Sequence, residues 1–192
     1  MTAPRIILYP VQPDPHMWKN LEYLNEGYDT AVWGKETFTD FLGHIRDHYD
    51  GYAIASVHMV DEQGRRSMPV GLYGFLPFPE EEEGAAETLV YLHPEARRLK
   101  VGTLLLSASA YAANEVPIAL YSDVRTTNDT SVALHTSAFP DLPRTGPYPS
   151  PFGYETFRWR ISDAMIPRPL GANIHVLSSL NLMLAYRAAW YS

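Results

Sequence analysis

The 192-residue sequence contains no cysteine. This absence excludes disulfide bonds, zinc sites built from thiolates and any covalent intermediate on a cysteine. No uninterrupted apolar run approaches the roughly 18 to 20 residues that a membrane-spanning helix needs. The N-terminal stretch "MTAPRIILYPVQPDP" lacks the charged and then apolar plan of a secretory signal. We therefore expect a cytoplasmic protein that does not associate with membranes.

Positive charge is scarce as well: 15 Lys and Arg residues stand against 22 Asp and Glu residues, which gives a net charge of -7. Such a balance repels a phosphate backbone, so we expect no nucleic-acid partner, whereas cationic amines are electrostatically compatible. Part of the negative charge is the run at residues 80–83, which we interpret as a solvated loop rather than a cation site. The length fits one domain, with room for an appendage.

Hydrophobic periodicity predicts an α+β fold, a mixed α/β arrangement of strands and helices. Thr37 is the expected N-cap of the second helix. The segment 140–153 has five prolines in fourteen residues and is expected to be a loop. Strands are predicted at 5–11, 52–60, 67–78, 87–92, 118–124 and 154–162, and helices at 15–28, 38–49, 101–112, 128–139 and 172–191.

The last predicted helix, at residues 172–191, carries an apolar stripe that needs a cover. We expect residues 1–162 to form the main domain and residues 163–192 to form a helical extension. The extension packs either on its own domain or across a homodimer interface.

A basic turn follows the predicted strand that ends at residue 92. The backbone NH groups of Val101, Gly102 and Thr103 begin the next helix, and the unpartnered NH groups of a helix start bind anions. Gly102 would let a diphosphate approach the main chain closely. The alternative is an ordinary helix start with solvated basic residues. Three basic side chains flank the turn: Arg97, Arg98 and Lys100.

Residues 89–106, "LVYLHPEARRLKVGTLLL", resemble the acetyl-CoA motif of the GNAT superfamily of N-acetyltransferases. In that motif a strand ends in a proline turn and leads to Arg or Gln, two variable residues, Gly, one variable residue, and Gly or Ala. Arg97 takes the first place and Gly102 the last, but Lys100 stands where the family usually has its first glycine. A lysine there either contacts a CoA phosphate or obstructs the turn. We favour the phosphate contact because Gly102 and the basic flank are retained.

A second stretch, "NDTSVALHTSAF" at residues 128–139, is similar to the family's segment of Asn, two variable residues, Ala, two variable residues and Leu-Tyr. Asn128 takes the first place, and His135 takes the place of the tyrosine. The order of elements also agrees with a GNAT-like fold, which is a central, mostly antiparallel twisted sheet flanked by helices. The resemblance implies an N-acetyltransferase in which an amine directly attacks acetyl-CoA, the cosubstrate, in a ternary complex.

The resemblance also implies where the cosubstrate binds. The pantetheine arm is expected to pair with the strand before the turn, beside a cleft opened by the neighbouring strand at 118–124. No metal is expected. The implied cofactor-binding residues are Val90, Tyr91, Leu92, Arg97, Arg98, Lys100, Val101, Gly102, Thr103 and Asn128.

Two catalytic candidates follow from the same resemblance. His135 is expected to protonate the departing thiolate, because histidine is half-protonated near neutral pH; the alternative is a partly buried helix residue whose ring is satisfied. Glu87 is a candidate base for the amine, although it is one residue out of step with the usual place. Asp123 is a weaker candidate, and a water chain could replace both.

The acceptor is expected to be a small-molecule amine or a protein amine. Tyr28, Trp33, Tyr148 and Tyr154 would form an aromatic wall around it, the alternative being plain packing. His44 and His48 lie one helical turn apart, but no third metal ligand is indicated. The competing function is a non-catalytic CoA-binding or assembly protein on a GNAT scaffold.

Overall fold

The computed structural model describes residues 5–11, 15–27, 37–49, 51–78, 81–149, 153–164 and 181–188. Seven strands in these residues form one sheet in the order β1-β2-β3-β4-β5-β7-β6. Every neighbouring pair is antiparallel except β4 and β5, which are parallel. The predicted mixed, mostly antiparallel class is confirmed. The strands are β1 (Arg5–Pro10), β2 (Ala53–Val60), β3 (Arg66–Pro77), β4 (Ala86–Leu92), β5 (Leu120–Arg125), β6 (Thr145–Pro149) and β7 (Glu155–Arg160).

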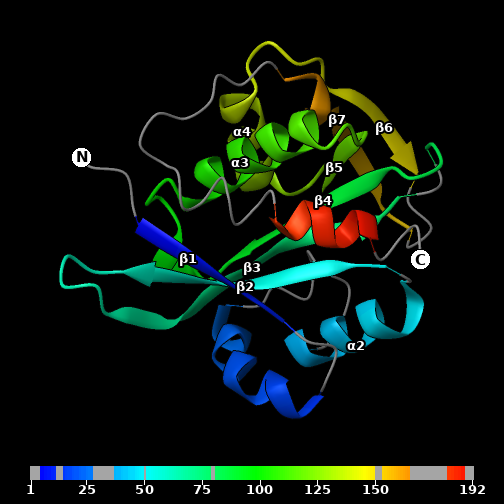
Figure 1. Ribbon diagram of the computed structural model, residues 1–192. Helices are drawn as coiled ribbons and strands as arrows, with labels where there is room; N and C mark the ends of the chain where they lie inside the picture. The colour runs from blue at the N-terminus through cyan, green and yellow to red at the C-terminus, as the bar shows by residue number, and fades with distance from the viewer. Residues whose placement is uncertain are drawn as a thin grey trace.

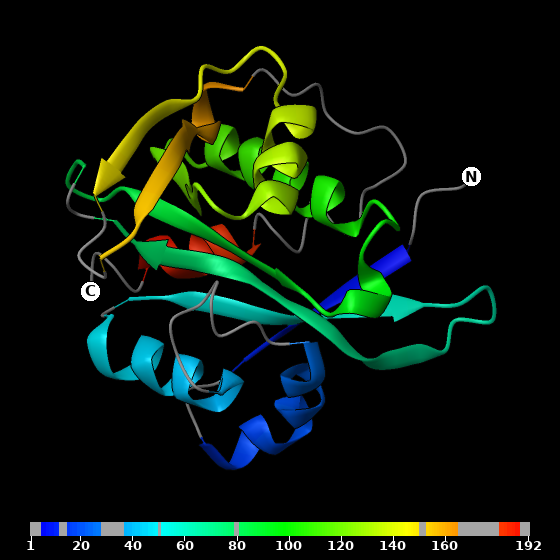
Figure 2. The same ribbon diagram turned by 180° about the vertical axis from the view of Figure 1, so that it is seen from behind.

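Helical elements cover both faces of the sheet, as Figures 1 and 2 show. One hydrophobic cluster joins the sheet to the helices on one face, and a second cluster joins β2, β3 and β4 to the helices on the other. The sheet is therefore the middle layer of three. The first face carries α3 (Val101–Glu115), α4 (Asp129–Ala138) and a helix at 181–188, and the second carries η1 (Pro15–Gly27) and α2 (Phe38–His48).

The two elements on the second face follow directly from their sequences. Thr37 caps α2 as predicted: its side chain accepts from the amide of Asp40, whose carboxylate accepts in turn from the amide of Thr37. The predicted helix at 15–28 is instead a 3₁₀ helix, η1. Its buried residues 18, 21 and 24 recur every third position, which places them on one face when a turn has three residues.

The proline-rich segment contains a strand that was not predicted. Residues 145–149 form β6, which pairs with β7 at the edge of the sheet. Prolines cannot donate to a ladder but are accepted on an edge strand, and Pro147 and Pro149 both lie in β6. The expectation of a loop was therefore wrong for these five residues.

The helix at 181–188 packs onto its own chain. Leu182, Met183 and Tyr186 are buried in the same cluster as Phe75 of β3, and the Tyr186 hydroxyl donates to the carbonyl oxygen of Ala85 at 2.8 Å. These contacts favour packing in cis over the homodimer interface for this part of the predicted extension. The domain boundary at residue 162 and a homodimer stay predictions.

Candidate functional site

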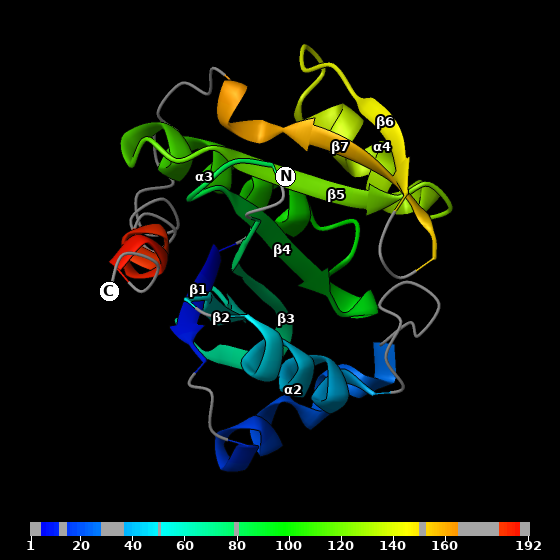
Figure 3. The same ribbon diagram turned by 90° about the vertical axis from the view of Figure 1, so that its right-hand side faces the viewer.

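The site begins where β4 and β5 separate. Two residue pairs, Ala86↔Leu120 and Glu87↔Tyr121, make up the parallel register between the described residues of these strands, although β4 continues to Leu92. Figure 3 shows the two strands diverging from this point. The backbone of the later part of β4 is therefore not paired with β5.

The hydrogen bonding of β4 decides which of its backbone groups face β5. The His93 amide donates to the carbonyl oxygen of Val70, in β3, at 2.8 Å. Such bonds recur at every second residue of an antiparallel pair, so Tyr91 also directs its NH and C=O groups toward β3, while Val90 and Leu92 direct theirs toward the side of β5. Of the three residues expected to pair with the pantetheine arm, Val90 and Leu92 have the required orientation, and Tyr91 does not.

The basic turn between β4 and α3 has unusual backbone angles for its residues. Arg98 and Lys100 both lie in the left-handed region, with φ values of 64° and 62°. Lys100 precedes α3 and makes no side-chain cap hydrogen bond. Glycine adopts this conformation without strain, which explains physically why the family motif has glycine where this chain has Lys100.

The first turn of α3 presents backbone donors. The amide of Leu104 is the first in the helix with an intrahelical acceptor, the carbonyl oxygen of Lys100 at 3.0 Å. The amides of Val101, Gly102 and Thr103 precede it, so the helix itself supplies them with no acceptor. They lie at the positive end of the helix dipole, which favours an anion.

The basic side chains beside this helix start are exposed. The Nε of Arg97 donates to the carbonyl oxygen of Leu92 at 3.2 Å, which ties the turn back to the strand end. Arg98 and Lys100 add two further positive charges. The turn thus combines backbone donors with three cations, a combination suited to a diphosphate.

Gly102 serves close packing. A Cβ atom built at this position would lie 2.9 Å from Cδ2 of Leu134 in α4 and 3.5 Å from Cδ1 of Leu92. Because Gly102 has no side chain, α3 can approach α4 closely. Leu134 of α4 occupies the space toward which a Cβ would point, so the space expected for a diphosphate does not lie on that side. Substitution of Gly102 by a charged residue consequently disturbs packing as well as any bound anion.

His135 is buried and fully engaged. Its Nδ1 lies 2.8 Å from the carbonyl oxygen of Ser131, so Nδ1 carries the proton that it donates, and Nε2 accepts from the Ser122 hydroxyl at 2.7 Å. Burial lowers the pKa of His135 to about 4. The ring is therefore neutral at pH 7 and has no proton on Nε2 to donate. The expectation of a half-protonated acid is not supported. The alternative of a satisfied ring describes the hydrogen bonding, although His135 is more deeply buried than that alternative expected.

The two candidate carboxylates differ in their surroundings. Glu87 is half-buried at the last residue pair before the strands diverge, on the sheet face that η1 and α2 occupy. Asp123 accepts from Arg158 through both oxygens, at 2.6 and 2.7 Å, and from the Thr156 hydroxyl at 3.2 Å. A carboxylate engaged in this way is poorly placed as a general base, which weakens Asp123 as a candidate.

Two of the four residues expected to form the aromatic wall lie in the described part of the chain. Tyr28 and Trp33 lie outside the described residues. The rings of Tyr148 and Tyr154 are each covered by a guanidinium group of this chain, Arg158 at 4.9 Å and Arg125 at 3.6 Å. A cationic acceptor would therefore have to share these rings with arginines.

Three further expectations concern Asn128, His44 and His48. Asn128 is the N-cap of α4, and its side chain accepts from the Ser131 amide at 3.2 Å. The rings of His44 and His48 lie 4.2 Å apart. No group of three or more metal-binding side chains occurs in the part of the chain that the structure describes.

Sequence reasoning did not find Arg158 and Ser122. Arg158 joins Asp123 to Glu81, which belongs to the run interpreted as a solvated loop. Ser122 is buried against His135. The alternating pattern of β7 places Arg158 on the polar face of the strand, but the partners of Arg158 are far away in the sequence.

No helix in the described residues combines the length and apolarity needed to cross a bilayer.

Comparisons with known proteins identify the family and the fold. A family model described as "Acetyltransferase (GNAT) family" matches residues 18–139. None of the curated proteins matches the chain.

Several solved structures have a similar fold. Spermidine N-acetyltransferase from Vibrio cholerae, in complex with CoA and spermine, is 17% identical with a TM-score of 0.55, over 82% of this chain and 98% of that one. A probable GNAT-family acetyltransferase from Chromobacterium violaceum is 18% identical with a TM-score of 0.61, over 80% and 81%. The aminoglycoside acetyltransferase AAC(6')-Ib in complex with coenzyme A is 16% identical with a TM-score of 0.60, over 80% and 94%. At these identities the likeness concerns the fold.

Proposed function

Because the chain belongs to the acetyltransferase (GNAT) family, we propose that it transfers the acetyl group of acetyl-CoA to a small cationic amine by direct attack in a ternary complex. The observation that carries the proposal is the turn between β4 and α3. It combines three helix-start amides with three exposed cationic side chains, beside a strand that pairs with β5 only at its first two residues.

In this proposal each part of the turn has a role toward the donor. The amides of residues 101–103, together with Arg97, Arg98 and Lys100, hold the diphosphate. The backbone of Val90 and Leu92 hydrogen-bonds the pantetheine arm, and a β4 amide polarises the thioester carbonyl. Holding both reactants in one geometry then supplies much of the rate enhancement.

The transfer breaks the thioester C–S bond and forms a C–N bond. The attacking amine loses one proton, and Glu87, directly or through water, is the described carboxylate best placed to receive it. The departing thiolate gains one proton. His135 is not its source, because its Nε2 accepts a hydrogen bond and its ring is neutral. We propose that water delivers this proton.

The nature of the acceptor is proposed from charge and from the relatives. The chain carries a net charge of -7, which attracts cations. Two of the similar structures are enzymes named for spermidine and aminoglycosides, both of which are small amines. A protein N-terminus or lysine is the alternative acceptor.

The test combines binding with turnover. Calorimetric titration with acetyl-CoA should show saturable binding, and thiol release should depend on an added amine from a panel of polyamines, aminoglycosides, amino acids and a lysine peptide. Transfer restricted to the peptide would reject a small-molecule acceptor. Binding without turnover on any amine would support the non-catalytic CoA-binding alternative. Absence of binding would contradict the proposal altogether.

A further inference from the structure

The two faces of the sheet differ where β4 and β5 diverge. On one face α3 and α4 pack against these strands, with His135 of α4 against Ser122 of β5. On the other face η1 and α2 pack against β2, β3 and β4. The residues of β5 and β7 on this second face instead contact β6 and the loop between β3 and β4. Charged side chains of β5 and β7 thus meet the β3–β4 loop on the second face.

Arg158 is the centre of that surface. Its guanidinium binds both oxygens of Asp123, at 2.6 and 2.7 Å, and also pairs with Glu81 from the β3–β4 loop. It lies over the rings of Phe78, at 4.5 Å, and Tyr148, at 4.9 Å. Only 12% of the Arg158 side chain is exposed. One side chain thus joins β5, β6, β7 and the β3–β4 loop.

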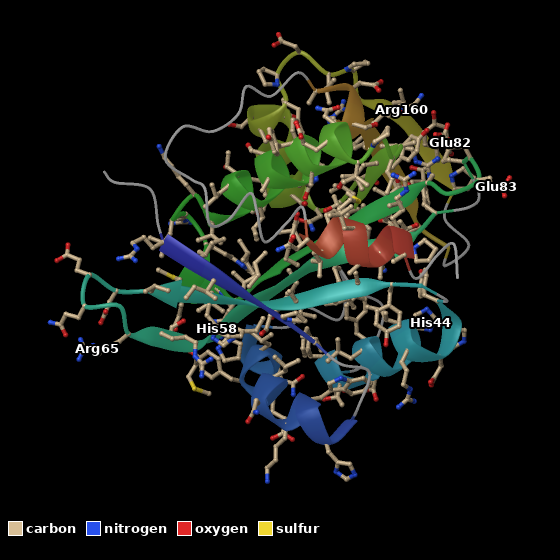
Figure 4. The ribbon with its side chains drawn as sticks, in the orientation of Figure 1. His44, His58, Arg65, Glu82, Glu83 and Arg160 are labelled. Carbon is tan, nitrogen blue, oxygen red and sulfur yellow. The ribbon has the colours of Figure 1, made fainter. Side chains whose placement is uncertain are left out.

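The surface around Arg158 carries an acidic excess. A second arginine, Arg160, faces Glu82 and Asp163 at 3.5 Å each, and Figure 4 shows Arg160 and Glu82 at the same corner of the molecule. Four carboxylates, those of Asp123, Glu81, Glu82 and Asp163, thus meet two guanidinium groups, and Arg125 on the same face of β5 adds a third, which leaves one negative charge in excess. Such a surface favours a cation.

We propose that Arg158 is a positioning residue for the amine acceptor. By holding Asp123, Glu81 and Tyr148 together it forms the acidic wall on which a positively charged amine is placed beside the diverging strands. Without Arg158 the two carboxylates repel each other and the wall separates. This inference rests on the acetyl transfer proposed above, and it adds the surface that selects an acceptor with more than one positive charge.

The test uses Arg158→Met and the double variant Arg158→Met with Asp123→Asn. The single change leaves the nearly buried carboxylate of Asp123 without its guanidinium and lowers stability, whereas the double change removes that charge and restores much of the stability. We expect the KM for a dicationic amine to rise about tenfold in both variants, which corresponds to about 1.4 kcal/mol. The affinity for acetyl-CoA should stay at the wild-type value.

Two matched variants complete the experiment. Arg160→Met should change the KM less than about twofold, because its ion pairs are long and half-exposed. Tyr148→Ala should raise the KM without affecting the fold, since Tyr148 is exposed. A wild-type KM in the double variant, or a loss of acetyl-CoA affinity equal to the rise in KM, would overturn the positioning role. Absence of acetyl transfer by the wild-type protein would overturn the proposed function and this inference with it.

Discussion

Replacing Lys100 by glycine should stabilise the unliganded protein and weaken its binding of CoA. Lys100 has φ 62° and ψ 9°, and the left-handed conformation costs an ordinary residue about 1–2 kcal/mol. Glycine avoids that cost but loses about 0.5–1 kcal/mol more conformational entropy on folding. The difference is a gain of about 1 kcal/mol, or roughly 2–4 °C in Tm for a chain of this size. Loss of the ammonium group removes a charge-assisted phosphate contact of about 1.5 kcal/mol, roughly a tenfold loss of affinity.

The assay is urea unfolding without ligand at pH 7, combined with calorimetric titration of CoA. Lys100→Ala is the matched control, because it loses the same charge but keeps the left-handed backbone. Both variants should bind CoA more weakly, and only the glycine variant should unfold at higher urea concentration. A glycine variant that is less stable than wild type would refute the strain argument, and wild-type CoA affinity in both variants would refute the phosphate contact.

Three further changes test the surrounding structure. The His135 pKa of about 4 lies below the ordinary value of 6.5. Its contribution of about 3 kcal/mol to the free energy of unfolding is therefore fully present above pH 6.5 and is lost as the pH falls toward 4. Urea unfolding at pH 7 and 4.5 should show a smaller loss of stability in His135→Gln than in the wild type. A Cβ at Gly102 would lie 2.9 Å from Cδ2 of Leu134, the end of a flexible side chain that can shift, and alanine gains about 1 kcal/mol of helix propensity. Gly102→Ala should therefore change the free energy of unfolding by less than about 1 kcal/mol, and a loss of more than about 2 kcal/mol would contradict this. Tyr91→Phe should cost about 1–2 kcal/mol because the Leu24 carbonyl oxygen loses its 2.7 Å hydrogen bond, and unchanged chemical denaturation would contradict this.

The local features of the chain were predictable from the sequence, because each depends on neighbouring residues. Thr37 and Asp40 form the expected helix cap. The basic turn begins α3 at Val101, the start of its predicted helix. The spacing of apolar residues along the chain predicted most of the strands and helices that bring the turn beside the diverging strands. These signals need no knowledge of the tertiary structure.

The remaining features depend on contacts between distant segments. Arg158 meets Asp123 and Glu81 only after the strands are ordered in the sheet. The state of His135 depends on Ser122 and on burial, neither of which its helical position reveals. The edge position that accepts the prolines of β6 is likewise a property of the whole sheet.

Binding of the CoA diphosphate by the turn between β4 and α3 is tested most directly by amide chemical shifts. In a nuclear magnetic resonance titration, CoA should shift the amide signals of Val101, Gly102 and Thr103, because a bound anion accepts from these groups. Pantetheine, which lacks the diphosphate, should leave them nearly unchanged while it shifts Val90 and Leu92. Saturable CoA binding without a change at residues 101–103 would contradict the account.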